Sequence, residues 1–397
     1  MKAGRKPESP AASFGRLSDP IVGLAPERVR RYKATMKTDM TDHIPDQIAA
    51  MAALEAKARL KGYQYAPKPL ARLDADIRVT YTGVCATDMH MIDNNWGLSR
   101  YPLVPGHEVV GHVIAVGSDV KDLKIGDVVG LGAQAQACGE CEFCKEGHDN
   151  LCPNRKFTYF GNTVDETGEH VHHGGFSSYL RTDSRFLFKI PAGYEERHVG
   201  PLMCGGLTVA APLYEFAGNT WDLKGKRVGV VGIGGLGHMA IQFASKMGAE
   251  TIAVSRGTGK KQFCEELGAT GFIDSSAEAD VAANAGRLHY LLFCVSGGRI
   301  DINNYVGLMR PYGILHFVGV PDEVVRFNML PLLFQRLTLS ASPIGSSNQM
   351  RAMLEFAAAN DIKPIIEEFT HKRANEAIDK IRDGSIRFRA VLKNDLI

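Results

Sequence analysis

Between Ala75 and about Pro191 the hydrophobic positions occur in short runs that are typical of β-strands. These runs are DIRVTYTGV, EVVGHVIAVG, GDVVGLG and FSSYLRTDSRFLFKIP, and Gly, Pro and Asp separate them. The pattern predicts a β-rich domain. Before this domain the stretch PDQIAAMAALEAKARLKG predicts a helix, because its apolar residues lie near one helical face: Ile48, Met51, Ala52 and Leu54.

From about Val228 the pattern changes, and apolar strands alternate with segments of helical period. The expected strands are KRVGVVGI, TIAVS, GFIDS, HYLLFCVS and YGILHFVGV, and LGHMAIQFASKMGA and GKKQFCEELGA are expected helices. This alternation predicts an α/β domain with a doubly wound parallel sheet. The strand-like LTLSASPIG and the helix MRAMLEFAAAN follow. The chain ends with a predicted helix and strand in ANEAIDKIRDGSIRFRAVLKN.

Length and composition restrict the class of protein. A chain of 397 residues is long enough for two domains, and 45% hydrophobic residues, 23% charged residues and a net charge of +2 give no reason to expect nucleic acid or a membrane as partner. A small molecule is the expected partner. The chain has no apolar run of membrane-spanning length, and its basic start lacks the apolar core of a secretory signal. We expect a cytoplasmic protein whose first residues form a disordered tail, with a transit peptide as the alternative.

The stretch VVGIGGLGHMA has the spacing GxGxxG, formed by Gly232, Gly234 and Gly237. It follows a predicted strand and opens a predicted helix, which is the context of a dinucleotide-binding loop. Its glycines permit a tight turn and a close approach of the pyrophosphate, and the helix start supplies partial positive charge. We expect Gly235 and Leu236 to belong to the same loop.

The next predicted strand ends about 20 residues further on, where an NAD site would place an acidic residue. The sequence instead has Ser255 and Arg256, followed by Lys260 and Lys261. A hydroxyl and a guanidinium can hold a 2′-phosphate by charge-assisted hydrogen bonds, so we expect NADP(H). The alternative is that Arg256 and the lysines only form the solvated start of a helix.

Eight cysteines are too few for a disulfide-stabilised chain of this length, and a reducing compartment fits better. Four of them lie close together in CGECEFCKEGHDNLC: Cys138, Cys141, Cys144 and Cys152. Four thiolates in one loop are typical of a closed tetrahedral zinc site, which leaves no position for water or substrate. We therefore expect a structural zinc. A redox CxxC motif, which uses two cysteines, is the main alternative.

Together the motifs of the chain resemble those of the zinc-dependent medium-chain alcohol dehydrogenases, and most closely the cinnamyl alcohol dehydrogenase-like subgroup. The matching stretches, in family order from about residue 60, are GVCATDMH, NNWG, YPLVPGHEVVG, the cysteine cluster, PLMCGGLTV, VVGIGGLGHMA, SPIGS and SIRFRAVL. The resemblance implies a GroES-like catalytic domain over residues 1–203, of which 1–60 are a poorly determined extension, a Rossmann domain over 204–342 and a return to the catalytic domain over 343–397.

The resemblance also assigns roles that the spacing of the residues does not. It implies a second, catalytic zinc held by Cys85, His107 and Cys204, with the fourth position left for water or the substrate oxygen. Thr87 and His90 match the proton relay of the family, and Asp88 is expected to support the site by hydrogen bonding. Glu108 matches a carboxylate that binds the zinc transiently, with an acid that only supports the site or the fold as the alternative. Ala86 departs from the family pattern, which commonly has His there, so a contact to the cofactor phosphates is lost.

These residues predict an NADP(H)-linked alcohol dehydrogenase or aldehyde reductase with two zinc ions per chain, acting on primary alcohols and aldehydes, aromatic ones included. The resemblance implies a site in the cleft between the domains and a homodimer joined through the Rossmann sheets. One alternative is an NAD-linked polyol or secondary-alcohol dehydrogenase. A zinc- and NADPH-binding protein without turnover is an alternative of another class, against which the intact set of site residues argues.

Overall fold

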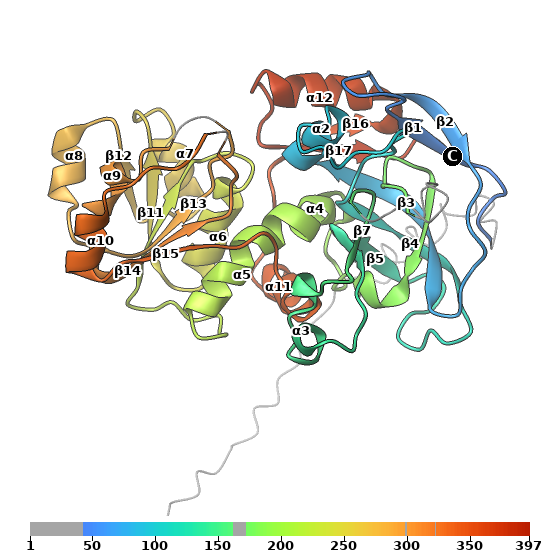
Figure 1. The fold of residues 1–397 in the computed structure, drawn as a ribbon, viewed down its shortest axis with the longest axis horizontal. Coiled ribbons are helices and arrows are strands. Elements are labelled where there is room, and N and C mark those ends of the chain that lie inside the picture. Colours follow the sequence, from blue (N-terminus) through green and yellow to red (C-terminus); the bar gives the residue numbers. More distant parts are fainter. Residues whose placement is uncertain (1–42, 162–171, 298–299, 322) are drawn as a thin grey trace, which may run out of the picture. The chain divides into compact units, whose positions relative to one another are not determined.

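The computed structural model describes residues 43–161, 172–297, 300–321 and 323–397, and every structural statement below refers to these residues (Figure 1). Two main sheets organise them, one mixed and one fully parallel. The disordered tail expected at the start of the chain lies outside the described residues.

The mixed sheet has the strand order β16-β17-β3-β4-β5-β9, and β8 pairs with β3 beside this path. Its strands β16 and β17 come from the end of the chain, and β17 pairs antiparallel with β3, which lies much earlier in the sequence. The β-rich domain expected from the pattern is confirmed. The strand bounds are β3 Asp74–Val84, β4 Val109–Val116, β5 Val128–Leu131, β8 Tyr179–Asp183, β9 Leu187–Lys189, β16 Ile366–Thr370 and β17 Arg389–Lys393.

The predicted helix around residue 50 is wrong. Residues Ile48–Ala52 form strand β1, which pairs antiparallel with β2, Lys61–Tyr65. The backbone N–H of Met51 also donates to the carbonyl of Phe176 at 2.8 Å. The apolar spacing fitted a helix, but extended neighbouring backbone offers this segment hydrogen bonds on both sides, and tertiary context overrides a weak local preference.

The parallel sheet has the strand order β12-β11-β10-β13-β14-β15, and every neighbouring pair in it is parallel. Numbered along the chain this order is 3-2-1-4-5-6, the order of a Rossmann sheet, so the doubly wound prediction is confirmed. The order reverses between β10 and β13. The strand bounds are β10 Arg227–Val231, β11 Glu250–Ser255, β12 Gly271–Asp274, β13 Leu288–Phe293, β14 Met309–Phe317 and β15 Thr338–Ala341.

Helices connect the parallel strands, and further helices belong to the β-rich part and the end of the chain. The connecting helices are α6 Gly237–Lys246, α7 Lys261–Glu266, α8 Glu278–Ala283, α9 Asn303–Val306 and α10 Met329–Gln335. The others are α2 Ala86–Ile92, α3 Glu142–Lys145, α4 Glu196–Pro201, α5 Leu207–Phe216, α11 Ser347–Ala359 and α12 Ala374–Arg382. The short elements are β6 Gln134–Gln136, β7 Lys156–Phe157, η1 Asp149–Leu151, η2 Ser184–Phe186, the π-helical turn η3 Leu202–Gly206 and η4 His371–Arg373.

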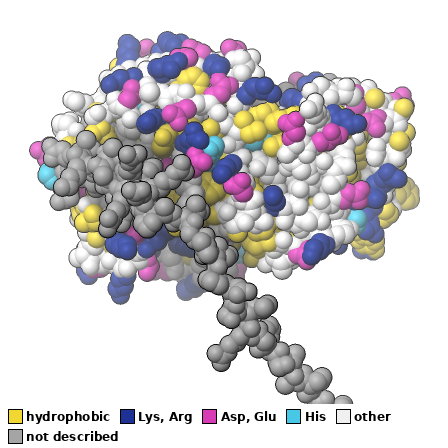
Figure 2. All heavy atoms as spheres, turned by 180° about the vertical axis from the view of Figure 1, so that it is seen from behind, with side chains coloured by type: hydrophobic (Ala, Val, Ile, Leu, Met, Phe, Trp, Pro, Cys, Tyr) yellow, Lys and Arg dark blue, Asp and Glu magenta, His cyan; other side chains and the backbone are white. Residues whose placement is uncertain are grey.

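One continuous cluster of buried apolar residues connects the two sheets. It includes Val109 of β4, Met203 of η3 and Phe243 of α6. No helix within the described ranges is both long and apolar enough to cross a membrane. On the face drawn in Figure 2, basic (dark blue) and acidic (magenta) side chains of the described residues are mixed with one another.

Candidate active site and metal centres

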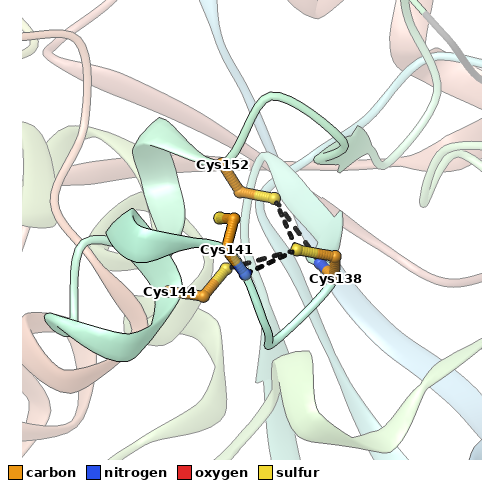
Figure 3. Close-up of side chains that lie close together, drawn as sticks. All are labelled: Cys138, Cys141, Cys144 and Cys152. Atoms are coloured by element: carbon orange, nitrogen blue, oxygen red, sulfur yellow. Dashed lines mark hydrogen bonds between the residues drawn. The ribbon is translucent and has the colours of Figure 1, made fainter.

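The cysteines of the 138–152 loop come together in the structure (Figure 3). Cys138 follows β6, Cys141 is the N-cap of α3, Cys144 lies in α3 and Cys152 is the C-cap of η1. Their four Sγ atoms all lie within 4.8 Å of one another. Backbone N–H groups also point at the sulfurs, because Cys141 N donates to Cys138 Sγ at 3.4 Å and Cys138 N donates to Cys152 Sγ at 3.5 Å.

The donor set of this loop fits a zinc ion. It consists of four thiols, which fill a tetrahedral coordination shell and leave no position for a substrate. Gly139 and Gly147, with φ of 79° and 84°, adopt the left-handed conformation that lets the loop turn around the sulfurs. The backbone N–H groups of Glu140 and Cys141 lower the pKa of the Cys138 thiol to about 6, which favours the thiolate that a metal requires.

A second cluster combines residues that lie far apart in the sequence. Cys85 follows β3, His107 and Glu108 precede β4, and Cys204 lies in η3. One ligand atom of each of the four lies within 4.8 Å of the others. β3 and β4 are antiparallel neighbours, and the N–H of Gly83 donates to the carbonyl of Glu108 at 2.8 Å, which brings the first three side chains together. A π-helical turn, common at functional sites, carries the fourth.

Glu108 is completely buried and forms an ion pair with Arg389 of β17. Its Oε1 accepts from Arg389 Nη2, whereas its Oε2 has no hydrogen-bond partner among the described residues. Burial raises the pKa of Glu108 to about 7, against the opposing effect of Arg389. An orphaned carboxylate oxygen beside two thiols and an imidazole fits a cation. Cys85, His107 and Cys204 would then supply the three protein ligands of an open zinc site.

Asp88 connects the segments that carry the second cluster. Its Oδ2 accepts the N–H of Cys85 at 2.8 Å. Its Oδ1 accepts the N–H of Gly106 at 3.0 Å and lies 3.1 Å from His107 Nδ1. If this ring nitrogen donates to the carboxylate, Nε2 of His107 is left to face a metal, which is the usual arrangement behind a histidine ligand. This geometry agrees with the supporting role expected for Asp88.

Thr87 and His90 both lie on α2, which begins directly after Cys85. Thr87 is half-buried, two residues after that cysteine. Asn95 Nδ2 lies 3.0 Å from His90 Nδ1, and this contact holds the imidazole ring in place. The ring of Trp96 stacks on the imidazole, with centroids 4.8 Å apart. Sequence reasoning assigned no role to Asn95, although it lies in the quoted NNWG stretch.

The glycine-rich loop connects β10 with α6 at the reversal of the strand order, where dinucleotides bind in such sheets. Gly232 has φ of 87°, and a Cβ there would meet a side-chain carbon of Val295 at 2.5 Å. A Cβ on Gly234 would meet nothing within 4 Å, so the protein itself leaves space beside this backbone. Gly235 packs against Arg389, and Leu236 is the N-cap of α6, whose first residue is Gly237. The loop geometry fits a pyrophosphate.

A buried histidine that sequence reasoning missed joins this loop to the end of the chain. His238 Nδ1 donates to the carbonyl of Gly234 at 3.0 Å, and its Nε2 accepts the N–H of Ile365 at 3.1 Å. Phe388 stacks on its ring with centroids 5.2 Å apart. Burial lowers the pKa of His238 to about 4, so the imidazole is neutral near pH 7.

The residues expected to select the cofactor lie at the carboxyl end of β11. Ser255 is the last residue of the strand and is half-buried, whereas Arg256 and Lys260 are exposed. Lys260 Nζ donates to the carbonyl of Ile233 in the glycine-rich loop at 2.7 Å. Sequence reasoning missed Asp274, which is paired with Ser255 on the neighbouring strand β12 and accepts the N–H of Gly257 at 2.8 Å.

Comparison with known proteins matches both parts of the chain to described domain families. Residues 72–192 match the alcohol dehydrogenase GroES-like domain, and residues 235–359 match the zinc-binding dehydrogenase domain. A similar curated protein is the aldehyde reductase AdhA of Synechocystis sp., which is 40% identical over 348 residues, 87% of this chain and 99% of the relative. Cinnamyl alcohol dehydrogenase 2 of Rauvolfia serpentina is 33% identical over 90% of this chain and 97% of its own length.

Solved structures show the same relationship. A cinnamyl alcohol dehydrogenase from Sorghum bicolor superposes with a TM-score of 0.81 at 34% identity, covering 88% of this chain and 98% of that one. The cinnamyl alcohol dehydrogenase of Helicobacter pylori, solved in complex with NADP(H), superposes with a TM-score of 0.79 at 28% identity, covering 88% and 99%. The family indicated by the motifs is therefore confirmed. The chain belongs to the zinc-containing medium-chain alcohol dehydrogenase family.

Proposed function

We propose that this alcohol dehydrogenase acts as an NADP(H)-linked aldehyde reductase, with primary alcohols and aldehydes, aromatic ones included, as its substrates. The observation that carries the proposal is the cluster of Cys85, His107 and Cys204, whose ligand atoms lie within 4.8 Å of one another and of a Glu108 oxygen. Three soft ligands fit a zinc ion with one coordination position left for a substrate oxygen.

The bound groups and the side chains divide the chemistry. Zinc would polarise an aldehyde carbonyl or lower the pKa of an alcohol, and the nicotinamide would donate or accept the hydride. The chain itself moves the proton. The Thr87 hydroxyl accepts it from an alcohol or returns it to the product of reduction, and the His90 imidazole, in contact with Asn95, exchanges it with solvent. His90 is half-buried, which leaves it a route to solvent.

The NADP(H) preference rests on the residues at the end of β11. Ser255 and Arg256 offer a hydroxyl and a guanidinium, and Lys260 adds a positive charge next to the glycine-rich loop. A planar guanidinium holds a phosphate through two hydrogen bonds. The Helicobacter pylori relative was solved with NADP(H), which supports the same preference here.

Asp274 is the observation that favours the alternative, an NAD-linked polyol or secondary-alcohol dehydrogenase. Its carboxylate lies on the strand next to Ser255 and could accept from ribose hydroxyls. However, its Oδ1 already accepts from the N–H of Gly257 and from the N–H and hydroxyl of Ser276. This oxygen is therefore occupied by protein donors and is not free to accept from a ribose hydroxyl. For this reason we favour NADP(H).

Aromatic substrates are supported by the rings around the second cluster. Phe160 meets His107 edge to face with centroids 6.3 Å apart, and Phe157 stacks on Phe160 at 4.4 Å. Aromatic side chains bind flat apolar groups well. Two of the relatives are named aldehyde reductase and cinnamyl alcohol dehydrogenase. We extend this substrate class to the present chain.

We also propose a homodimer formed through the parallel sheet. Strand β15 lies at one end of the strand order. The preceding segment and helix α10 carry exposed apolar side chains: Val320, Val324, Leu330, Leu333 and Phe334. Phe334 is 85% exposed. An edge strand beside such a patch is typical of a surface that a second copy covers.

A cofactor and substrate screen tests the function. Purified protein is assayed with benzaldehyde, cinnamaldehyde and polyols, with NADPH or NADP+ and with NADH or NAD+, beside a Cys85→Ser variant. We expect NADPH oxidation with the aromatic aldehydes and its loss in the variant. A strong preference for NAD and polyols would support the alternative, and no turnover with any substrate would favour the protein that binds zinc and NADPH without catalysis.

A further inference from the structure

A tyrosine from the segment that follows the cysteine loop donates to the carboxylate behind His107. Tyr159 Oη lies 2.5 Å from Asp88 Oδ1, the same oxygen that accepts from Gly106 N and lies next to His107 Nδ1. We propose that Tyr159 is a positioning residue for the catalytic zinc, acting through Asp88 on the ligand His107. This inference rests on the proposed role of His107 as a zinc ligand.

The tyrosine is held in place independently of the carboxylate. It is 1% exposed, and its ring stacks on His107 with centroids 5.9 Å apart and meets Phe160 edge to face at 5.2 Å. The backbone of the preceding residue anchors the segment, because Thr158 N donates to Ala133 O at 2.9 Å. The ring is therefore fixed, and its hydroxyl points at Asp88.

Without the tyrosine hydroxyl, the buried Asp88 Oδ1 loses its hydroxyl donor. A phenol that donates to a buried carboxylate forms a strong, charge-assisted bond. The remaining donors, Gly106 N and His107 Nδ1, belong to one short segment and hold the oxygen from that side only. The carboxylate would then be held by Cys85 N at Oδ2 and by the Gly106–His107 segment at Oδ1, with no hydroxyl opposite that segment. The acceptor that orients the His107 ring would be less firmly fixed. Losing such a partner behind a ligand typically costs about 10- to 100-fold in metal affinity.

The position of Tyr159 also connects the cysteine loop to the second cluster along the chain. The residue lies seven positions after Cys152, and the intervening strand β7 pairs with β6, which leads to Cys138. Cys152 O accepts the N–H of Arg155 at 3.1 Å, so the chain turns back directly after the last cysteine. The segment that carries the tyrosine therefore begins at the cysteine loop, and the Thr158 backbone and the ring contacts of Tyr159 hold it beside Asp88.

The test compares Tyr159→Phe with the control Thr158→Val in the zinc-loaded enzyme. Thr158→Val removes the buried hydroxyl that donates to Gly132 O, and it keeps both the backbone hydrogen bond of Thr158 N to Ala133 O and the contact of Tyr159 with Asp88. Release of zinc to a chromogenic chelator is followed in both variants, and the absorption of the cobalt-substituted site is recorded. We expect Tyr159→Phe to release one zinc about 10-fold faster than wild type and to shift the cobalt absorption. Thr158→Val should lose thermal stability and keep the wild-type release rate and spectrum.

Equal zinc release and equal cobalt spectra in Tyr159→Phe and wild type would overturn the proposal, as would the same change in Thr158→Val. If Tyr159→Phe does not fold, Asp88→Asn gives the test, since it keeps the side-chain shape and should accelerate zinc release at least as much. These readouts do not depend on turnover. An enzyme that binds zinc as expected and reduces no aldehyde would contradict the proposed function alone, whereas zinc absent from the Cys85 cluster would contradict both.

Discussion

Arg389 and Glu108 lie 281 positions apart in the sequence and form a buried ion pair beside the Cys85, His107 and Cys204 cluster. Removing the guanidinium leaves a buried carboxylate without its partner, which typically costs about 3 to 5 kcal/mol. Arg389→Met should therefore lower the free energy of unfolding by about 3 kcal/mol, measured by urea denaturation.

The control for this variant is Arg382→Met, which breaks the exposed ion pair with Asp93. Exposed pairs contribute less than about 1 kcal/mol, so its effect should be small. Adding Glu108→Gln to Arg389→Met should restore part of the stability. Equal losses of stability in Arg389→Met and Arg382→Met would show that the Arg389–Glu108 pair contributes no more to stability than an exposed ion pair.

His238 should make the stability of the protein fall in acid. Its pKa is about 4 in the folded state against about 6.5 when unfolded, so the unfolded chain binds the extra proton first. Its contribution is present above about pH 6.5 and is lost as the pH falls toward 4. In His238→Gln the free energy of unfolding should fall by up to about 3 kcal/mol less between pH 7 and pH 4 than in wild type, measured by urea denaturation. The same profile in wild type and variant would contradict the assignment, and His43→Gln, at an exposed histidine, is the control.

Arg256 should select the phosphorylated cofactor. Arg256→Gln removes a charge-assisted partner of the 2′-phosphate, worth about 1.5 to 3 kcal/mol, so KM for NADPH should rise at least about 10-fold. KM for NADH should change little. Arg287→Gln is the matched control, because this exposed arginine directly precedes β13 and lies at the amino-terminal ends of the parallel strands, opposite to Arg256. A parallel rise for both cofactors would assign Arg256 a general role instead.

The cysteine loop should act on stability before it acts on catalysis. Its hydrogen bonds connect it to the start of α11, because Asn150 Nδ2 donates to Ile344 O at 2.7 Å and Ser347 N donates to Asp149 Oδ1 at 2.9 Å. Cys141→Ser should therefore lower Tm by several degrees, since structural zinc contributes folding energy. Turnover of the molecules that remain folded should persist at low temperature.

Cys85→Ser is the contrasting variant, with turnover lost and Tm close to wild type. Tm from calorimetry and turnover, measured on the same samples, distinguish Cys85→Ser from Cys141→Ser. Loss of turnover in Cys141→Ser without any change in Tm would contradict this division between the two clusters.

The cysteine loop and both sheets could be predicted because their signals are local. Cys138 and Cys152 lie within one short stretch, and strand and helix periods repeat along the chain. The second cluster is different, because β3, β4 and η3 bring its residues together from three segments, and the resemblance, not the spacing, grouped them. Arg389 and Tyr159 could not be assigned at all, since their partners Glu108 and Asp88 are neighbours only in the folded chain. The strand β1 was missed because its apolar spacing fits a helix and one of its hydrogen-bond partners, the carbonyl of Phe176, is distant in sequence.

The most direct test of the account is zinc content and NADPH-dependent aldehyde reduction followed together while a chelator removes the metal. We predict about two zinc ions per chain at the start, loss of all activity as the ion at Cys85, His107 and Cys204 leaves, and recovery when zinc is returned. Full activity in protein that retains only the zinc of the cysteine loop would contradict the account.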